Sequence, residues 1–199
     1  SYQKTRGTMS GTVRILSIDG GGIRGIIPAL ILEHLEHRTG RKISELFHLL
    51  AGTSTGGIIA CALTSPSPSG HPRAASDILN LFRQHGKEIF QSSFWHGFGS
   101  LGGLVDEKYD TKDLEDILEN FFGDTMLSEV HQDLLVTSYD IHRRKPFFFK
   151  SWKARGEHLG DNETATQRDF EVRWVARATS AAPTYFEPAV LKKQTSTLP

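Results

Sequence analysis

Ser54 lies in the middle of a Gly-Thr-Ser-Thr-Gly run from Gly52 to Gly56, which matches the pattern Gly-x-Ser-x-Gly. The apolar run before it predicts a buried strand, and the run after it predicts a helix. The serine would then lie on the sharp turn between them, beside free N–H groups and the positive end of the helix dipole. That is the geometry of a nucleophilic serine. The same pattern also fits a glycine-rich turn whose serine only caps the helix.

A second glycine-rich segment, Asp19-Gly20-Gly21-Gly22-Ile23-Arg24-Gly25, follows a predicted strand over 13–18. Its glycines at 20, 22 and 25 match the Gly-x-Gly-x-x-Gly fingerprint of dinucleotide-binding sites. That fingerprint needs an acidic residue at the end of the next strand, and Ala51-Gly52-Thr53-Ser54 offers none. Consecutive glycines can instead direct several N–H groups into one concavity, an oxyanion hole. Since parallel strands end at one edge of a sheet, we expect this segment to face Ser54.

The other helices and strands are predicted from hydrophobic periodicity and from helix-capping residues. A helix over 26–37 is predicted after the first glycine segment, with Gly40 suited to its end. Helices are also predicted from 76, from 111 and over 170–179, and strands over 134–139 and 147–149. The polar stretch 153–168 predicts a long loop. The stretch 94–105 is rich in glycine and large apolar residues and predicts a mobile lip near the site, or a packed loop under the next helix.

Three blocks of this sequence together resemble the patatin-like phospholipase family: residues 19–25, residues 52–57 and the late segment Ala178-Thr179-Ser180-Ala181-Ala182-Pro183-Thr184-Tyr185-Phe186. They occur in the expected order. The resemblance implies a three-layer α/β/α sandwich with a mostly parallel central sheet, formed by residues 13–199 after a polar segment, 1–12. It also implies a lipid acyl hydrolase of the phospholipase A type, which cleaves acyl esters of phospholipids or related lipids.

The resemblance further implies a Ser–Asp dyad with Ser54 as nucleophile. The oxyanion loop would be Gly20, Gly21 and Gly22, with Arg24 bracing it or approaching the lipid phosphate, and Gly25, Gly52 and Gly56 would be motif glycines. The family's aspartate lies in an Asp-Gly-Gly or Asp-Gly-Ala turn soon after the late block. Here the only Asp-Gly is Asp19-Gly20, in the oxyanion loop, so the aspartate is expected beyond Pro199. The possible substitutes lack the following glycine: Asp140, Asp161 and Asp169.

Three alternatives stay open. An α/β-hydrolase esterase would use His142 or His158 as base, but that fold places several strands before its nucleophile, and only one is predicted before the Ser54 strand. A nucleotide- or phosphate-binding module would use the segment Gly20–Gly25. A patatin-like scaffold without catalytic activity would lack the aspartate.

Composition excludes several classes of partner. Of 199 residues, 38% are hydrophobic, and Lys+Arg equal Asp+Glu at 23 each, so no net field favours nucleic acid. The nine histidines are scattered without ligand spacing, so neither a metal nor a cofactor is predicted. The single cysteine, Cys61, is expected to be a buried structural thiol.

With no signal-peptide core or membrane-length run in the printed sequence, we expect a cytoplasmic protein with transient membrane contact, for which Phe94, Trp95 and Phe98 are candidates.

Overall fold

The computed structural model describes residues 11–90, 111–181 and 188–191. In chain order its elements are β1 (Ile15–Ile18), the 3-10 helix η1 (Gly22–Gly25), α1 (Ile26–Thr39), α2 (Ile43–Leu46), β2 (Leu49–Gly52), α3 (Thr55–Thr64), α4 (Ala75–Phe90), α5 (Thr111–Phe122), the 3-10 helix η3 (Leu127–Glu129), β3 (Asp133–Asp140), β4 (Lys145–Lys150), α6 (Ser151–Ala154) and α7 (Val172–Ser180). The predicted lip at 94–105 and residues 1–10 of the predicted polar segment lie outside the described residues.

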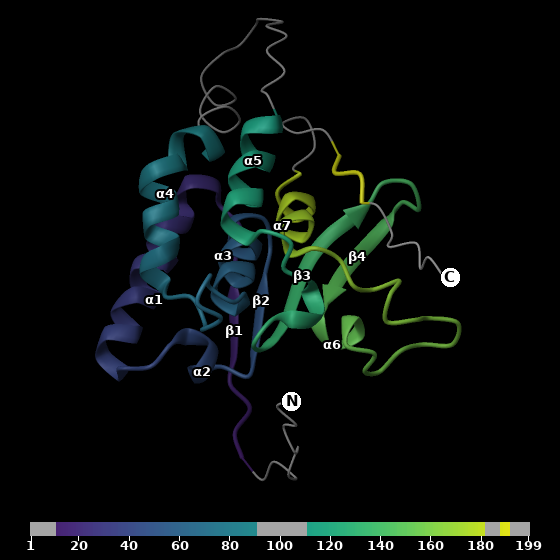
Figure 1. Cartoon of the computed structure of the whole chain (residues 1–199), viewed down its shortest axis with the longest axis horizontal. Helices are drawn as coiled ribbons and strands as arrows, with labels where there is room; N and C mark the ends of the chain where they lie inside the picture. The colour runs from purple at the N-terminus through teal and green to yellow at the C-terminus, as the bar shows by residue number, and fades with distance from the viewer. Residues whose placement is uncertain (1–10, 91–110, 182–187, 192–199) are drawn as a thin grey trace, which may run out of the picture.

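The strands form one sheet in the order β1-β2-β3-β4 (Figure 1). β1, β2 and β3 are parallel, and β4 is antiparallel to β3. Ile18 pairs with Gly52, and Gly52 pairs with Val136, so the carboxyl ends of β1 and β2 meet at one edge. The mostly parallel sheet that the sequence predicted is confirmed.

The helix α3 is the centre of the core. All of its residues from Thr55 to Thr64 are buried, and it contacts β1, β2, β3 and α7. Helices therefore flank the sheet, which is consistent with the predicted α/β/α class. Cys61 is completely buried in this helix, and burial raises the pKa of its thiol, which confirms the predicted structural cysteine.

The two faces of the sheet differ in exposure. Leu50, Leu134 and Val136 on the face toward α3 are completely buried, as strands packed against a helix require. On the opposite face Ile15 and Phe148 are 57% and 46% exposed. The core that positions the candidate site thus lies between the sheet and α3.

The outer helices α4 and α5 bury the apolar faces that the sequence predicted. Buried side chains of α4 and α5 include Ile78, Leu79, Phe82, Leu114, Leu118 and Phe122. α1 packs against α4 on the β1 side of the molecule, whereas β4 and α6 lie at the opposite side (Figure 1). α1 ends at Gly40 in the left-handed conformation, with φ 65°, where the sequence predicted its end.

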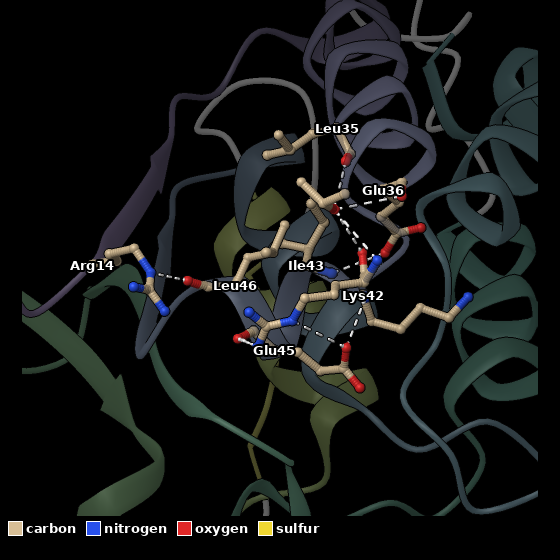
Figure 2. Close-up of polar contacts among 9 residues, drawn as sticks. Arg14, Leu35, Glu36, Lys42, Ile43, Glu45 and Leu46 are labelled. Atoms are coloured by element: carbon tan, nitrogen blue, oxygen red, sulfur yellow. Dashed lines mark hydrogen bonds and ion pairs between the residues drawn. The ribbon is translucent and has the colours of Figure 1, made fainter.

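Glu36 on α1 connects three helices through one carboxylate. Its Oε1 accepts a hydrogen bond from the N–H of Ile43 at 2.9 Å, and its Oε2 accepts one from the N–H of Ala75 at 2.9 Å. Figure 2 shows Glu36 beside Ile43 at the start of α2. Helix N-termini leave N–H groups unsatisfied and favour negative charge, so Glu36 fixes the starts of α2 and α4 against α1.

Among the described residues, no helix is both long enough and apolar enough to cross a membrane.

Candidate active site

Ser54 occupies the turn between β2 and α3, at the N-cap position of α3. Its backbone has φ 55° and ψ −127°, a conformation that L-residues rarely adopt and that costs on the order of 1–3 kcal/mol. The hydroxyl makes no capping hydrogen bond to α3. The interpretation of Ser54 as a capping serine is therefore wrong.

The motif glycines permit close backbone contacts around this turn. A Cβ atom on Gly52 would lie 2.3 Å from the carbonyl oxygen of Gly56. One on Gly56 would lie 2.1 Å from the carbonyl oxygen of Ile18 and 2.7 Å from that of Asp19. No side chain fits at either position, so both glycines are needed for α3 to start so close to β1 and β2.

The glycine segment after β1 lies directly against the serine. A Cβ atom on Gly20 would lie 2.9 Å from Cβ and 3.7 Å from Oγ of Ser54. The fold thus brings together the two glycine segments that are more than 30 positions apart in the chain, by pairing β1 with β2.

The glycine segment and the start of α3 supply the candidate backbone N–H donors next to the serine. Gly21 is the N-cap of η1, and Gly22 begins it with φ 59°. In the described part of the chain, the turn and cap hydrogen bonds include none donated by the N–H groups of Gly20, Gly21 or Gly22. Thr55 is the first residue of α3, whose first-turn N–H groups have no partner within the helix. Free N–H groups at a helix start are typical anion-binding groups, so those of the glycine segment and of Thr55 are the candidate donors to an anion beside Ser54.

Arg24 lies at the back of this glycine loop. Its N–H donates to the carbonyl oxygen of Gly21 at 3.2 Å, and its Nε lies 3.5 Å from the same oxygen. Beside it an open groove of about 380 Å³ runs between β1 and α1; its lining includes Gly20, Gly21, Arg24 and the apolar residues Leu16, Ile18, Ile27, Pro28, Ile31 and Leu32.

The three carboxylates that could substitute for the missing aspartate either accept hydrogen bonds from other residues or lie on an exposed loop. Asp169 accepts hydrogen bonds from the N–H and the hydroxyl of Ser128, at 2.9 and 2.7 Å. Asp140 accepts one from the N–H of Arg143 at 2.9 Å, and this bond lowers the pKa of the carboxyl. Asp161 is exposed on the loop that follows α6. None of the three forms a hydrogen bond with Ser54 in the structure described.

The histidines of the esterase alternative are also in turns. His142 is exposed in the β3–β4 turn, and His158 is exposed with φ 51° after α6. Within the described residues no cluster of three or more His, Cys, Asp or Glu side chains could hold a metal ion.

The sequence over residues 16–195 matches the patatin-like phospholipase family. The chain belongs to that family. Two relatives from Solanum tuberosum, "Probable inactive patatin-3-Kuras 1" and "Patatin-T5", are each 36% identical over 201 residues that cover 96% of this chain and 50% and 48% of theirs. "Patatin-17" from Solanum cardiophyllum is 35% identical over 193 residues, covering 92% of this chain and 46% of its own. The chain spans about half the length of the curated relatives it matches.

For one residue at this patatin-like site, the sequence predicted no role. Thr179, near the end of α7, accepts a hydrogen bond through Oγ1 from the backbone N–H of Ser54 at 2.8 Å. Thr179 belongs to the late block that resembles the family, but a contact across 125 positions has no local signature. The local signal that could have pointed to it is Gly57, a glycine beyond the Gly-x-Ser-x-Gly pattern, where a Cβ atom would lie 2.7 Å from Cγ2 of Thr179.

Proposed function

We propose that the chain is a lipid acyl hydrolase with Ser54 as its nucleophile. The strained, uncapped conformation of Ser54 on the β2–α3 turn, with Gly20 against its side chain, carries this proposal. A serine that neither caps the helix nor relaxes its backbone fits a nucleophile elbow better than a structural turn. Membership in the patatin-like phospholipase family supports an acyl lipid as the substrate class.

The reaction follows from this arrangement. Ser54 Oγ attacks the carbonyl carbon of an acyl ester and loses its proton to a general base. The N–H groups of Gly20, Gly21, Gly22 and Thr55 stabilise the tetrahedral oxyanion, and loss of one such donor typically lowers the rate by about 10²–10³. Collapse breaks the ester C–O bond and releases the alcohol, protonated by the base, and water then hydrolyses the acyl-enzyme. Arg24 braces the glycine loop or attracts the lipid phosphate.

The general base in this proposal is an aspartate outside the described residues, as the family resemblance implies. Asp140 and Asp169 are held by Arg143 and Ser128, which argues against either as the partner of Ser54. No metal or cofactor is needed for acyl transfer of this kind. The substrate also requires transient contact with a lipid surface, which we assign to Phe94, Trp95 and Phe98.

The alternatives have less support. A dinucleotide site needs an acidic residue at the end of β2, which ends at Gly52 and continues as Thr53-Ser54. The second alternative is a scaffold without catalytic activity, and one relative is named "Probable inactive patatin-3-Kuras 1".

The test is covalent labelling of the full-length protein with a fluorophosphonate, with phosphatidylcholine micelles as substrate. We expect the label on Ser54, and we expect Ser54→Ala to abolish both labelling and hydrolysis. Ser69→Ala, in the exposed loop after α3, is the matched control and should behave like the wild type. Hydrolysis retained by Ser54→Ala would refute the assignment, and a folded wild type that neither labels nor hydrolyses would establish the inactive scaffold.

A further inference from the structure

The turn that holds Ser54 is hydrogen-bonded to α7, a helix far away in the sequence. Thr179 on α7 accepts the backbone N–H of Ser54 at 2.8 Å, whereas Ser54 itself has the strained φ of 55°. Such a conformation persists only where the surrounding structure holds it. We propose that Thr179 is a positioning residue that keeps Ser54 in its reactive conformation, an inference that rests on the proposed function.

Gly57 makes room for this contact. A Cβ atom on Gly57 would lie 2.7 Å from Cγ2 and 3.0 Å from Oγ1 of Thr179, and 3.1 Å from Cγ1 of Val136. Any larger residue at 57 would push Thr179 away from Ser54. The two adjacent glycines thus have separate purposes: Gly56 admits the backbone of β1, and Gly57 admits the side chain of Thr179.

The position of α7 is itself fixed just before Thr179. The hydroxyl of Ser138 on β3 donates to the carbonyl oxygen of Ala178 at 3.1 Å. Arg177 is only 2% exposed, and its Nε lies 3.2 Å from Oε1 of Glu115 on α5. α7 also packs against α3 and β3. A threonine on a helix fixed in this way can hold the turn at a defined place.

This contact also determines which N–H groups serve the oxyanion. Because the N–H of Ser54 donates to Thr179, it is not directed at a substrate carbonyl. The donors that remain beside Ser54 Oγ are those of the glycine loop and of Thr55. Loss of the Thr179 hydroxyl would free the Ser54 N–H and let the turn relax, which would move Oγ relative to those donors.

Two conservative variants separate the hydroxyl from the methyl group of Thr179. Thr179→Val keeps the branched shape but removes the acceptor, and Thr179→Ser keeps the acceptor but removes Cγ2. In the full-length protein we expect Thr179→Val to lower kcat and the fluorophosphonate labelling rate by roughly 10–100-fold, the usual cost of a misplaced reactive group. KM should change little, because Thr179 does not line the groove beside the glycine loop. Thr179→Ser should retain most of the wild-type rate.

Thr137→Val is the matched control. It removes a hydroxyl from the same sheet edge, one that lies 2.7 Å from the hydroxyl of Thr53 and not against the Ser54 N–H. Its effect on kcat should be well below that of Thr179→Val. Equal losses in Thr179→Val and Thr179→Ser, or wild-type labelling of Thr179→Val, would overturn the proposal.

Hydrogen exchange of the Ser54 amide provides a readout that does not depend on catalysis. Exchange should be faster in Thr179→Val than in the wild type and in Thr179→Ser. If the wild type does not label at all, the hydrolase proposal fails, but the exchange rates still decide whether Thr179 holds the turn. Identical exchange in all three proteins contradicts the inference.

Discussion

Gly56 and Ile18 are in such close contact that a Cβ atom on Gly56 would lie 2.1 Å from the carbonyl oxygen of Ile18. Ile18 is the last residue of β1, and Gly56 is in the first turn of α3. The glycine loop begins two residues after Ile18, and Ser54 lies two residues before Gly56. The approach of β1 to α3 therefore sets the separation between the candidate oxyanion loop and the candidate nucleophile.

Gly56→Ala should destabilise the fold strongly. The atoms in the way belong to the backbone of Ile18 and Asp19 and cannot rotate aside, so we expect a loss of at least about 2 kcal/mol in the free energy of unfolding. Urea unfolding of the full-length protein measures it. Gly86→Ala, inside α4, is the control, because the one contact of its Cβ among the described residues would be Cδ1 of Ile23 at 3.4 Å. That variant should be as stable as the wild type or more stable by up to about 1 kcal/mol. Equal stability of the two variants would contradict the packing argument.

An alanine at position 25 should cause a steric clash that a second substitution can relieve. A Cβ atom there would lie 2.3 Å from Cγ2 of Thr55, and the next contacts, Cβ of Thr55 and Cδ1 of Ile59, are at 3.3 and 3.5 Å. Gly25 has φ −57°, so alanine is compatible with its backbone. We expect Gly25→Ala alone to cost about 1–3 kcal/mol.

Thr55→Ser removes the methyl group that clashes. The double variant Gly25→Ala/Thr55→Ser should therefore be more stable than the sum of the two single changes predicts, by about 0.5–3 kcal/mol. Denaturant unfolding of all four proteins completes the cycle. Strict additivity would mean that η1 moves away from α3 and that the contact between them is loose.

The fold could be predicted because its signals are local. Apolar periodicity located α1, α4 and α5, and alternating or continuous apolar runs located the strands. β1 begins at Ile15, later than predicted: the carbonyl oxygen of Arg14 still accepts from the N–H of His48 at 2.8 Å, but the N–H of Arg14 donates to Nδ1 of the His48 side chain at 3.0 Å. The short helices α2 and α6 were not predicted. α2 and α6 are only four residues long each, too short for an apolar repeat to show.

The candidate site could be predicted only in part, because one of its contacts joins residues that are far apart in the sequence. Glycine patterns located Ser54 and the loop around Gly21, and parallel pairing of β1 with β2 implied that they meet. The hydrogen bond from Ser54 to Thr179 joins residues that share no motif, so it emerges only from the packing of α7 on α3.

Contact with lipid should depend on Phe94, Trp95 and Phe98. A lipase must take an acyl chain out of an aggregate, and each large side chain that is buried contributes roughly 1.5–3 kcal/mol. Replacing the three by serine should weaken vesicle binding and turnover of micellar substrate in the full-length protein, while hydrolysis of a short soluble ester is retained. The nearby apolar residues Leu101 and Leu104 are candidates for the same role. A parallel loss of soluble-ester and micellar activity would identify the segment as core packing.

Glu163 should make stability depend on pH in acid. One of its oxygens, Oε2, accepts hydrogen bonds from Nζ of Lys153 at 2.5 Å and from the N–H of Gly160 at 3.0 Å, and Oε1 contacts the guanidinium of Arg168. These contacts, led by the hydrogen bond from Lys153, lower its pKa from 4.5 to about 2. A depressed pKa means that the carboxylate stabilises the folded state fully above the unfolded-state pKa. That contribution is lost as the pH falls from about 4.5 toward about 2.

Glu163→Gln removes the charge but keeps the size of the side chain. Its free energy of unfolding should therefore lie below that of the wild type at pH 7, and the difference should shrink steadily between pH 5 and pH 3. Asp161→Asn, exposed on the same loop, is the control and should differ little from the wild type throughout. Urea unfolding at several pH values measures both variants, and a carboxyl NMR titration of Glu163 measures its pKa directly. A difference between Glu163→Gln and the wild type that stays constant down to pH 3 would show that Lys153 and Arg168 do not depend on the charge of Glu163, and that the loop after α6 is held by packing.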